Sequence, residues 1–329
     1  MEHSSSSTST HGAPEGRALV LGGGGSTGNA WLIGIVAGLA DAGLDVTSAD
    51  LTVGTSAGAT AAAQLAGATP ADLFAATVSA VAGIASRRPA GAPAAQNAPG
   101  TQNAPGTQTP PSPQGAPNRP VSDHLARFQA MIADAAGPAD LRRTLGAQAL
   151  ARDAASDGSW SAQWRSTVAA RFAARDWPVD RGLRLTAIDA TTGDSVVFGR
   201  ESDVDLVDAV AASTSGGGQP FRIGAGRYLD GGYRSNPDNA DLAAGFERVL
   251  VLSPLGGRSL FPAEWGLRLE VQVEALRAGG SRVETVFPRA DVEHLFGANA
   301  MDPSLRPLAA QAGFDQGAAL APELTAFWG

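Results

Sequence analysis

Short apolar runs that end in glycine alternate with longer apolar stretches along the first 70 residues of the chain. Residues 18–21 form an apolar run that leads into four consecutive glycines, and residues 51–53 form a second run that leads into Gly54. Runs this short, bounded by glycine, are typical of buried strands. Between them, from about Thr27, apolar side chains recur as in a helix that is buried around most of its surface, at Trp31, Leu32, Ile35, Val36 and Leu39.

The rest of the chain continues this alternation. Thr69 and Pro70 supply an N-cap and a first-turn proline for a helix that extends to about Ser86. Because strands that alternate with helices form parallel sheets under helical cover, we predict an α/β fold with a central, mostly parallel sheet flanked by helices. Further helices are predicted within residues 122–176, 203–212, 265–278 and the C-terminal segment, and further strands at 183–188, 195–198, 227–229, 248–252 and 283–287.

Two segments lack the apolar side chains that a core requires. Residues 1–16 contain mainly Ser, Thr, Gly and His, and we predict a disordered N-terminal tail. Residues 87–120 contain the hexapeptide QNAPGT twice in tandem, followed by a Pro-rich run. We predict that they form a flexible insert rather than a domain.

The composition excludes several kinds of chemistry. The 329 residues include no Cys, and all 24 basic residues are Arg. A disulfide, a Cys nucleophile, a Schiff-base lysine and a Ser–Lys dyad are therefore excluded. The formal net charge of −8 argues against a nucleic-acid partner. The longest apolar run, residues 30–40, is shorter than the ~20 residues of a membrane-spanning helix, and the polar N-terminus does not resemble a secretory signal, so we expect a cytoplasmic protein.

The first candidate motif is the glycine-rich segment after the first predicted strand. Gly23-x-Gly25-x-x-Gly28 satisfies G-x-G-x-x-G between a strand and a helix, which is the context of a dinucleotide-binding loop. That function also requires an acidic residue at the end of the second strand, whereas Asp45 and Asp50 precede that strand. The same loop can instead present backbone N–H groups to an oxyanion at a helix N-terminus, or serve only as a tight turn.

The second motif, Gly54-Thr55-Ser56-Ala57-Gly58, matches G-x-S-x-G between a strand and a helix. In a nucleophile elbow the serine occupies a sharp, strained turn, and the flanking glycines leave room for close packing of the strand and the helix. The helix N-terminus also favours negative charge at the serine oxygen. We therefore predict that Ser56 is a nucleophile, the alternative being a serine that only caps the helix.

A serine nucleophile requires a base, and the chain offers few candidates. His124 lies beside the flexible insert and His294 lies in the C-terminal helical segment, so neither follows a predicted strand. Asp230 does follow one, in the sequence Asp230-Gly231-Gly232. A carboxylate within hydrogen-bond distance of the serine can accept its proton directly. The alternative for this motif is a hairpin turn, of which Asp-Gly is a common sign.

Together the three motifs resemble those of the patatin-like phospholipases. The resemblance rests on GGGGSTG at 22–28, GTSAG at 54–58 and DGG at 230–232. It covers residues 17–329 apart from the 87–120 insert. It implies that residues 17–329 form one hydrolase domain with a three-layer, patatin-like α/β fold.

The resemblance also implies an activity and a set of site residues. Ser56 is the expected nucleophile and Asp230 the expected base of a dyad that cleaves carboxylic esters of acyl lipids. The backbone N–H groups of Gly23, Gly24 and Gly25 are the expected oxyanion hole. No metal or other cofactor is implied.

Two positions depart from the pattern of that family. Thr27 stands where the family usually has Arg or Lys, so we expect weaker contacts with a phosphate head group. Residues 213–220 are rich in Ser and Gly where the family is richer in Pro and apolar residues, which alters the expected acyl pocket. Neither departure removes a member of the dyad.

Two other functions stay open at this point. One is a dinucleotide-binding oxidoreductase that uses the glycine-rich loop, and the other is a catalytically weak lipid-binding protein of the same family. The expected partner is an acyl lipid or ester substrate. Any transient contact with a membrane surface is expected to use apolar or amphipathic surface, because the net charge opposes electrostatic attraction.

Overall fold

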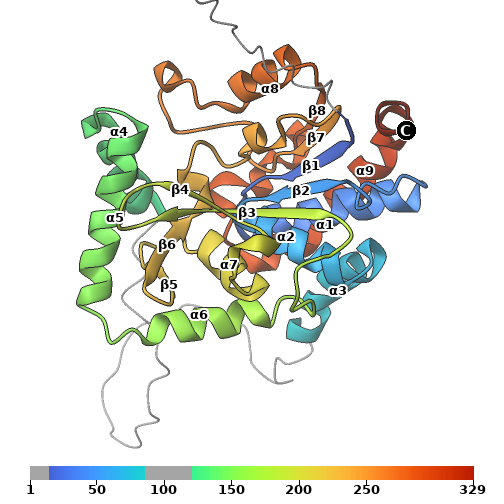
Figure 1. Ribbon diagram of the computed structural model, residues 1–329. Helices are drawn as coiled ribbons and strands as arrows, with labels where there is room; N and C mark the ends of the chain where they lie inside the picture. Colours follow the sequence, from blue (N-terminus) through green and yellow to red (C-terminus); the bar gives the residue numbers. More distant parts are fainter. Residues whose placement is uncertain (1–14, 86–120) are drawn as a thin grey trace, which may run out of the picture.

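The computed structural model describes residues 15–85 and 121–329 (Figure 1). The described strands form one eight-stranded sheet in the order β5-β6-β3-β2-β1-β7-β8, and β4 pairs with β3 outside this path. The strands are β1 (Arg17–Leu21), β2 (Leu51–Gly54), β3 (Gly182–Asp189), β4 (Ser195–Phe198), β5 (Phe221–Ile223), β6 (Gly226–Asp230), β7 (Arg248–Leu252) and β8 (Arg282–Val286).

Five neighbouring strands, β3-β2-β1-β7-β8, pair in parallel, whereas β4, β5 and β6 pair antiparallel at the other end of the sheet. The prediction of an α/β fold with a mostly parallel sheet is therefore confirmed. The helices are α1 (Gly25–Asp41), α2 (Ala57–Gly67), α3 (Pro70–Ala85), α4 (Val121–Asp134), α5 (Pro138–Ala154), α6 (Ser159–Ala169), α7 (Leu206–Ser213), α8 (Leu269–Ala278) and α9 (Arg306–Trp328).

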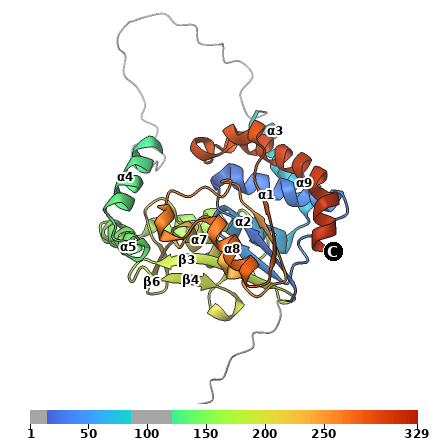
Figure 2. The same cartoon turned by 90° about the horizontal axis from the view of Figure 1, so that it is seen from above.

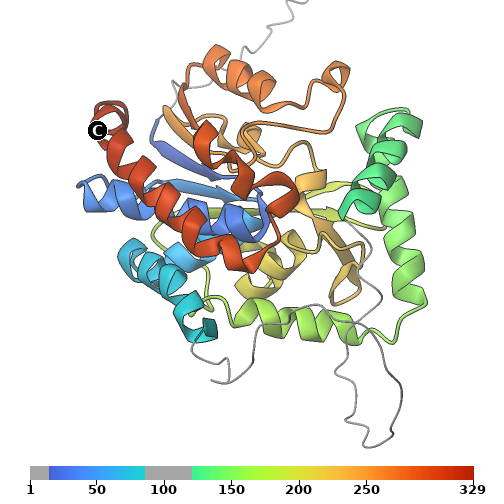
Figure 3. The ribbon, with the colours of Figure 1, turned by 180° about the vertical axis from the view of Figure 1, so that it is seen from behind.

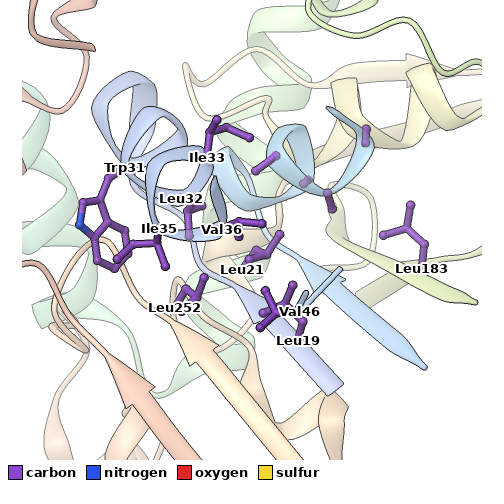
Figure 4. Packing of buried hydrophobic residues seen from close by; sticks show 14 of the residues in the cluster. Leu19, Leu21, Trp31, Leu32, Ile33, Ile35, Val36, Val46, Leu183 and Leu252 are labelled. Atoms are coloured by element: carbon purple, nitrogen blue, oxygen red, sulfur yellow. The ribbon is translucent and has the colours of Figure 1, made fainter. Parts of the chain in front are cut away.

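Helices cover both faces of the sheet because successive side chains of each strand point to opposite faces. Leu19 and Leu21 of β1 enter the larger apolar cluster, where Leu32 of α1 packs against the sheet (Figure 4). Ala18 and Val20 of the same strand enter a second cluster, which α8 covers. The sheet therefore forms the middle of three layers.

Helix α9 forms an outer layer over α1, as the views from above and from behind show (Figures 2 and 3). The two helix backbones approach closely because glycines lie at their contact. A Cβ atom on Gly34 would overlap the carbonyl oxygen of Ala310, and one on Gly317 would overlap that of Ile35. The C-terminal helix thereby holds α1, and with it the glycine-rich segment that begins α1, against the sheet.

The structure differs from the predicted elements in a few places. Strand β5 was not predicted, because three residues are too few for a pattern to emerge. Helix α8 begins at Leu269 rather than near Trp265, which lies in a separate 3-10 turn. The predicted insert at 87–120 and nearly all of the predicted tail at 1–16 lie outside the described residues.

The contact between α1 and α9 yields a prediction about stability. Replacing Gly317 with Val should lower the free energy of unfolding by at least ~1–3 kcal/mol, because the added atoms overlap backbone that cannot move without separating the helices. Thermal unfolding followed by circular dichroism measures the change. Gly137→Ala is the matched control, since no described atom lies within 4 Å of its added Cβ. Equal melting temperatures for the two variants would contradict the prediction.

Candidate active site

Ser56 lies in a sharp turn between β2 and α2. Its backbone has φ 52° and ψ −111°, a left-handed conformation that costs a non-glycine residue free energy. The turn brings α2 against β1 so closely that a Cβ atom on Gly58 would overlap the carbonyl oxygen of Leu21. The GTSAG segment therefore has the backbone geometry of a nucleophile elbow.

Asp230 ends strand β6 and pairs with Ala187 of β3, two residues past Leu185, which pairs with Gly54 at the end of β2. The hydroxyl of Ser56 donates a hydrogen bond of 2.8 Å to Oδ2 of Asp230. The backbone N–H of Gly232 donates a second hydrogen bond of 2.8 Å to Oδ1. Two predicted site residues that are 174 positions apart in sequence are thus in direct contact.

The environment of Asp230 raises its proton affinity. Burial raises the pKa of Asp230 to about 6, and the hydrogen bonds from Gly232 and Ser56 oppose the shift only in part. Burial and the Asp230 charge also raise the pKa of Tyr233, whose hydroxyl donates to the carbonyl oxygen of Gly216. A carboxylate of this basicity can accept a proton from the serine.

The glycine-rich loop lies beside the elbow. A Cβ atom on Gly23 would lie 3.6 Å from Cβ of Ser56. The N–H of Gly23, however, donates a 2.8 Å hydrogen bond to the carbonyl oxygen of Pro237. Among the described residues, the N–H groups of Gly24 and Gly25 have no acceptor. The first turn of α1 therefore offers free amide donors near the serine.

Thr27 is buried in the first turn of α1. Its side chain is fully buried, and its N–H donates to the carbonyl oxygen of Ala300 at 3.0 Å. A cation nevertheless approaches this turn from α9, because the guanidinium of Arg306 donates to the carbonyl oxygen of Ser26 at 2.7 Å. Weaker contacts of Thr27 with a phosphate head group stay a prediction, and Arg306 is a cation that reaches the same turn.

The second departure from the family pattern has a structural role. Ser213, at the end of α7, accepts the backbone N–H of Ser56 at 3.0 Å. No sequence motif marks Ser213 as a functional residue, nor Thr186 and Asn239, which are buried beside the elbow. The one available signal was the dense run of Asn, Asp and Ser that follows DGG in the sequence.

His294 is not found at the dyad. His294 is exposed in the 3-10 helix Ala290–Leu295, and its carbonyl oxygen accepts a hydrogen bond from Asn299. The side chain of His124 lies outside the described residues.

In the described part of the chain, no helix is long and apolar enough to cross a membrane.

A second buried carboxyl group lies under the glycine-rich loop. A Cβ atom on Gly22 would overlap Oδ1 of Asp238, and neither carboxylate oxygen has a hydrogen-bond partner of normal geometry among the described residues. Burial raises the pKa of Asp238 to about 7, and the Ser253 hydroxyl opposes this only weakly. At neutral pH the folded protein therefore holds a partly protonated acid beneath the loop.

The raised pKa of Asp238 predicts a stability effect with a defined sign. The folded state binds this proton more tightly than the unfolded state, so stability is lost as the pH rises from about 4 through about 7. Asp238→Asn should remove this loss and raise the free energy of unfolding at pH 8 by up to ~4 kcal/mol. Denaturant titrations at pH 5 and pH 8 measure it, with exposed Asp291→Asn as the control. An unchanged pH dependence in Asp238→Asn would contradict the prediction.

Comparison with known proteins identifies the family. The family model described as Patatin-like phospholipase matches residues 19–243, a span that contains all three motifs. No curated protein matches the chain. Among solved structures, the chain is similar to the crystal structure of VipD from Legionella pneumophila, with 12% identity over 94% of this chain and 67% of that chain and a TM-score of 0.41. Because the family model spans more than half of the sequence, the chain belongs to the patatin-like phospholipase family, a family of lipid acyl hydrolases.

Proposed function

We propose that the chain is a serine lipid acyl hydrolase, of the phospholipase A, lysophospholipase or esterase type, that uses a Ser56–Asp230 dyad. The observation that carries the proposal is the 2.8 Å hydrogen bond from the Ser56 hydroxyl to Asp230. It joins a strained elbow serine to a buried carboxylate whose pKa is about 6. This pairing of nucleophile and base is what acyl transfer requires.

The reaction proceeds in two steps. Ser56 Oγ attacks the ester carbonyl carbon while its proton passes to Oδ2 of Asp230, and the tetrahedral intermediate then expels the alcohol, which takes the proton from Asp230. Water next attacks the acyl-enzyme, with Asp230 accepting one proton and returning it to Ser56 as the fatty acid leaves. No step uses a metal or another cofactor.

Developing negative charge on the carbonyl oxygen needs hydrogen-bond donors. The predicted donors were the N–H groups of Gly23, Gly24 and Gly25. Because the Gly23 N–H already donates to Pro237, we assign the oxyanion hole to Gly24 and Gly25, where α1 begins. The positive end of that helix adds to the stabilisation.

An apolar wall beside Asp230 supports an acyl substrate. The rings of Phe128 and Tyr233 have centroids 5.5 Å apart, and the ring of Phe261 lies 6.3 Å from that of Phe128. The Tyr233 hydroxyl donates to the carbonyl oxygen of Gly216, and a Cβ atom on Gly216 would lie 3.2 Å from Oδ2 of Asp230, so the Tyr233 ring lies near the base. Aromatic and aliphatic side chains of this kind favour burial of a hydrocarbon chain.

The structure gives less support to dinucleotide binding. The carboxyl group of Asp238 lies against Gly22, directly under the loop that would have to hold a pyrophosphate. The end of β2 is the Ser56 elbow and carries no acid for a ribose. A bound flavin or nicotinamide in the purified protein would favour that alternative, and lipid binding without turnover would favour a catalytically weak family member.

The dyad yields a prediction about catalysis. Ser56→Ala should lower kcat for a p-nitrophenyl ester by on the order of 10⁶-fold, as expected for a nucleophile that works as part of a unit. Asp230→Asn should lower it by at least ~10²–10⁴-fold, the usual contribution of a general base. A fluorophosphonate probe should label Ser56 in the wild-type protein, which peptide mass spectrometry detects.

His294→Ala is the control for this prediction, and it should leave kcat within about tenfold of wild type. Circular dichroism of each variant excludes loss of fold as the cause. Labelling of a different serine, or substantial activity in Ser56→Ala, would show that the elbow is not the nucleophile.

The raised pKa of Asp230 predicts the pH profile. The base must be ionised to accept a proton, so kcat/KM should fall as the pH drops through about 6 and should be level above it. Initial rates with a neutral ester between pH 4.5 and pH 8.5 measure the profile. Asp238→Asn should retain the inflection near pH 6. That result would assign the inflection to Asp230 rather than to Asp238. Full activity at pH 5 in the wild-type protein would contradict the assignment of Asp230 as the base.

A further inference from the structure

Three polar side chains lie together beneath the dyad, and each is fully buried: Thr55, Thr186 and Asn239. The hydroxyl of Thr186, on β3, donates to Oγ1 of Thr55 at 2.9 Å. Nδ2 of Asn239 donates to the same Thr55 oxygen, also at 2.9 Å. Burial of polar groups is tolerated because they satisfy one another.

The amide of Asn239 also contacts the other half of the dyad. Its Nδ2 donates to the carbonyl oxygen of Gly231 at 3.1 Å. Thr55 directly precedes Ser56, and Gly231 directly follows Asp230. One rigid, planar amide group thus joins the segment that carries the nucleophile to the segment that carries the base.

Asn239 is itself held in a fixed orientation. Its Oδ1 accepts hydrogen bonds from Ser235 Oγ at 3.0 Å and from Arg234 Nη1 at 3.1 Å, so the amide cannot rotate without losing both. Its backbone N–H donates to Asn236 Oδ1 at 2.8 Å. Arg234 is fixed in turn by an ion pair of 2.7 Å with Asp241.

We propose that Asn239 is a positioning residue that sets the distance and orientation between Ser56 Oγ and Asp230. This inference rests on the proposed function, since it concerns the same dyad. Asn239 touches neither substrate nor reacting atoms, and it acts through Thr55 and Gly231. A misplacement of about 1 Å in such a pair can reduce the rate about 10²-fold.

The deciding experiment uses Asn239→Gly in the full chain. Asn239 has φ 54°, a conformation that glycine adopts without strain, so the variant deletes the amide and leaves the backbone unstrained. We expect kcat for a p-nitrophenyl ester to fall by about 10–100-fold, with KM within about twofold of wild type. The rate of fluorophosphonate labelling of Ser56 should fall by a similar factor.

Thr55→Val removes the acceptor of the hydrogen bond from Asn239. It is the substitute test if Asn239→Gly does not fold. Valine keeps the shape of Thr55 but cannot accept the hydrogen bond from Asn239. We expect the same fall in kcat at unchanged KM. Both variants remove the hydrogen bond between Asn239 and Thr55. The kcat of the double variant should therefore be close to that of the slower single variant, whereas the two losses would multiply if they were independent.

Gln316→Leu is the control for a merely structural role. Gln316 is a buried amide on α9: its Oε1 accepts from the indole N–H of Trp31, and its Nε2 donates to the carbonyl oxygen of Phe287. It should lose stability while keeping kcat. A folded Asn239→Gly with wild-type kcat, or equal losses of kcat in Asn239→Gly and Gln316→Leu at equal loss of stability, would overturn the proposal. Lack of ester hydrolysis and of probe labelling in the wild-type protein would instead refute the proposed function.

Discussion

The left-handed backbone of Ser56 is the constraint on which the rest of the site depends. Such a conformation costs a non-glycine residue about 1–3 kcal/mol, and it persists only where neighbouring contacts hold it. Here Gly58 lets α2 approach Leu21, and Ser213 accepts the Ser56 N–H. Relaxation to an ordinary helix cap would move Oγ away from Asp230. The hydrogen bond between the two side chains is therefore a consequence of backbone packing beneath them.

Burial gives Asp230 its basicity, and the sheet explains that burial. Asp230 pairs with Ala187 of β3, two residues past Leu185, which pairs with Gly54, so the last residue of β6 lies close to the carboxyl end of β2. In that position Asp230 is removed from water, and its pKa rises because the charged form loses hydration. The register of β6 against β3 therefore sets where the Asp230 carboxyl group lies relative to Ser56.

The sequence predicts the parallel part of the fold well, because strands covered on both faces are continuous apolar runs and the glycines after β1 and β2 mark their ends. It also predicts Ser56 and Asp230 as candidates, since the turn chemistry of each is local. It does not predict that the N–H groups of Gly23 and Thr27 are already bonded, because their acceptors are the carbonyl oxygens of Pro237 and Ala300. Those partners are more than 200 residues away in sequence, and no local pattern records such pairings.

The parallel strand order β3-β2-β1-β7-β8 is also the order of a doubly wound dinucleotide-binding sheet, and the glycine-rich loop follows the same first strand. Topology therefore cannot separate the two functions, and the separation comes from side chains. A pyrophosphate needs unobstructed positive potential at the start of α1, but Asp238 places a carboxyl group against Gly22. An oxyanion needs only one or two amide donors at a single point, and the proposed donors, the N–H groups of Gly24 and Gly25, are free without displacement of the acid beneath them. The same loop geometry thus favours a small, transient charge over a permanent, extended one.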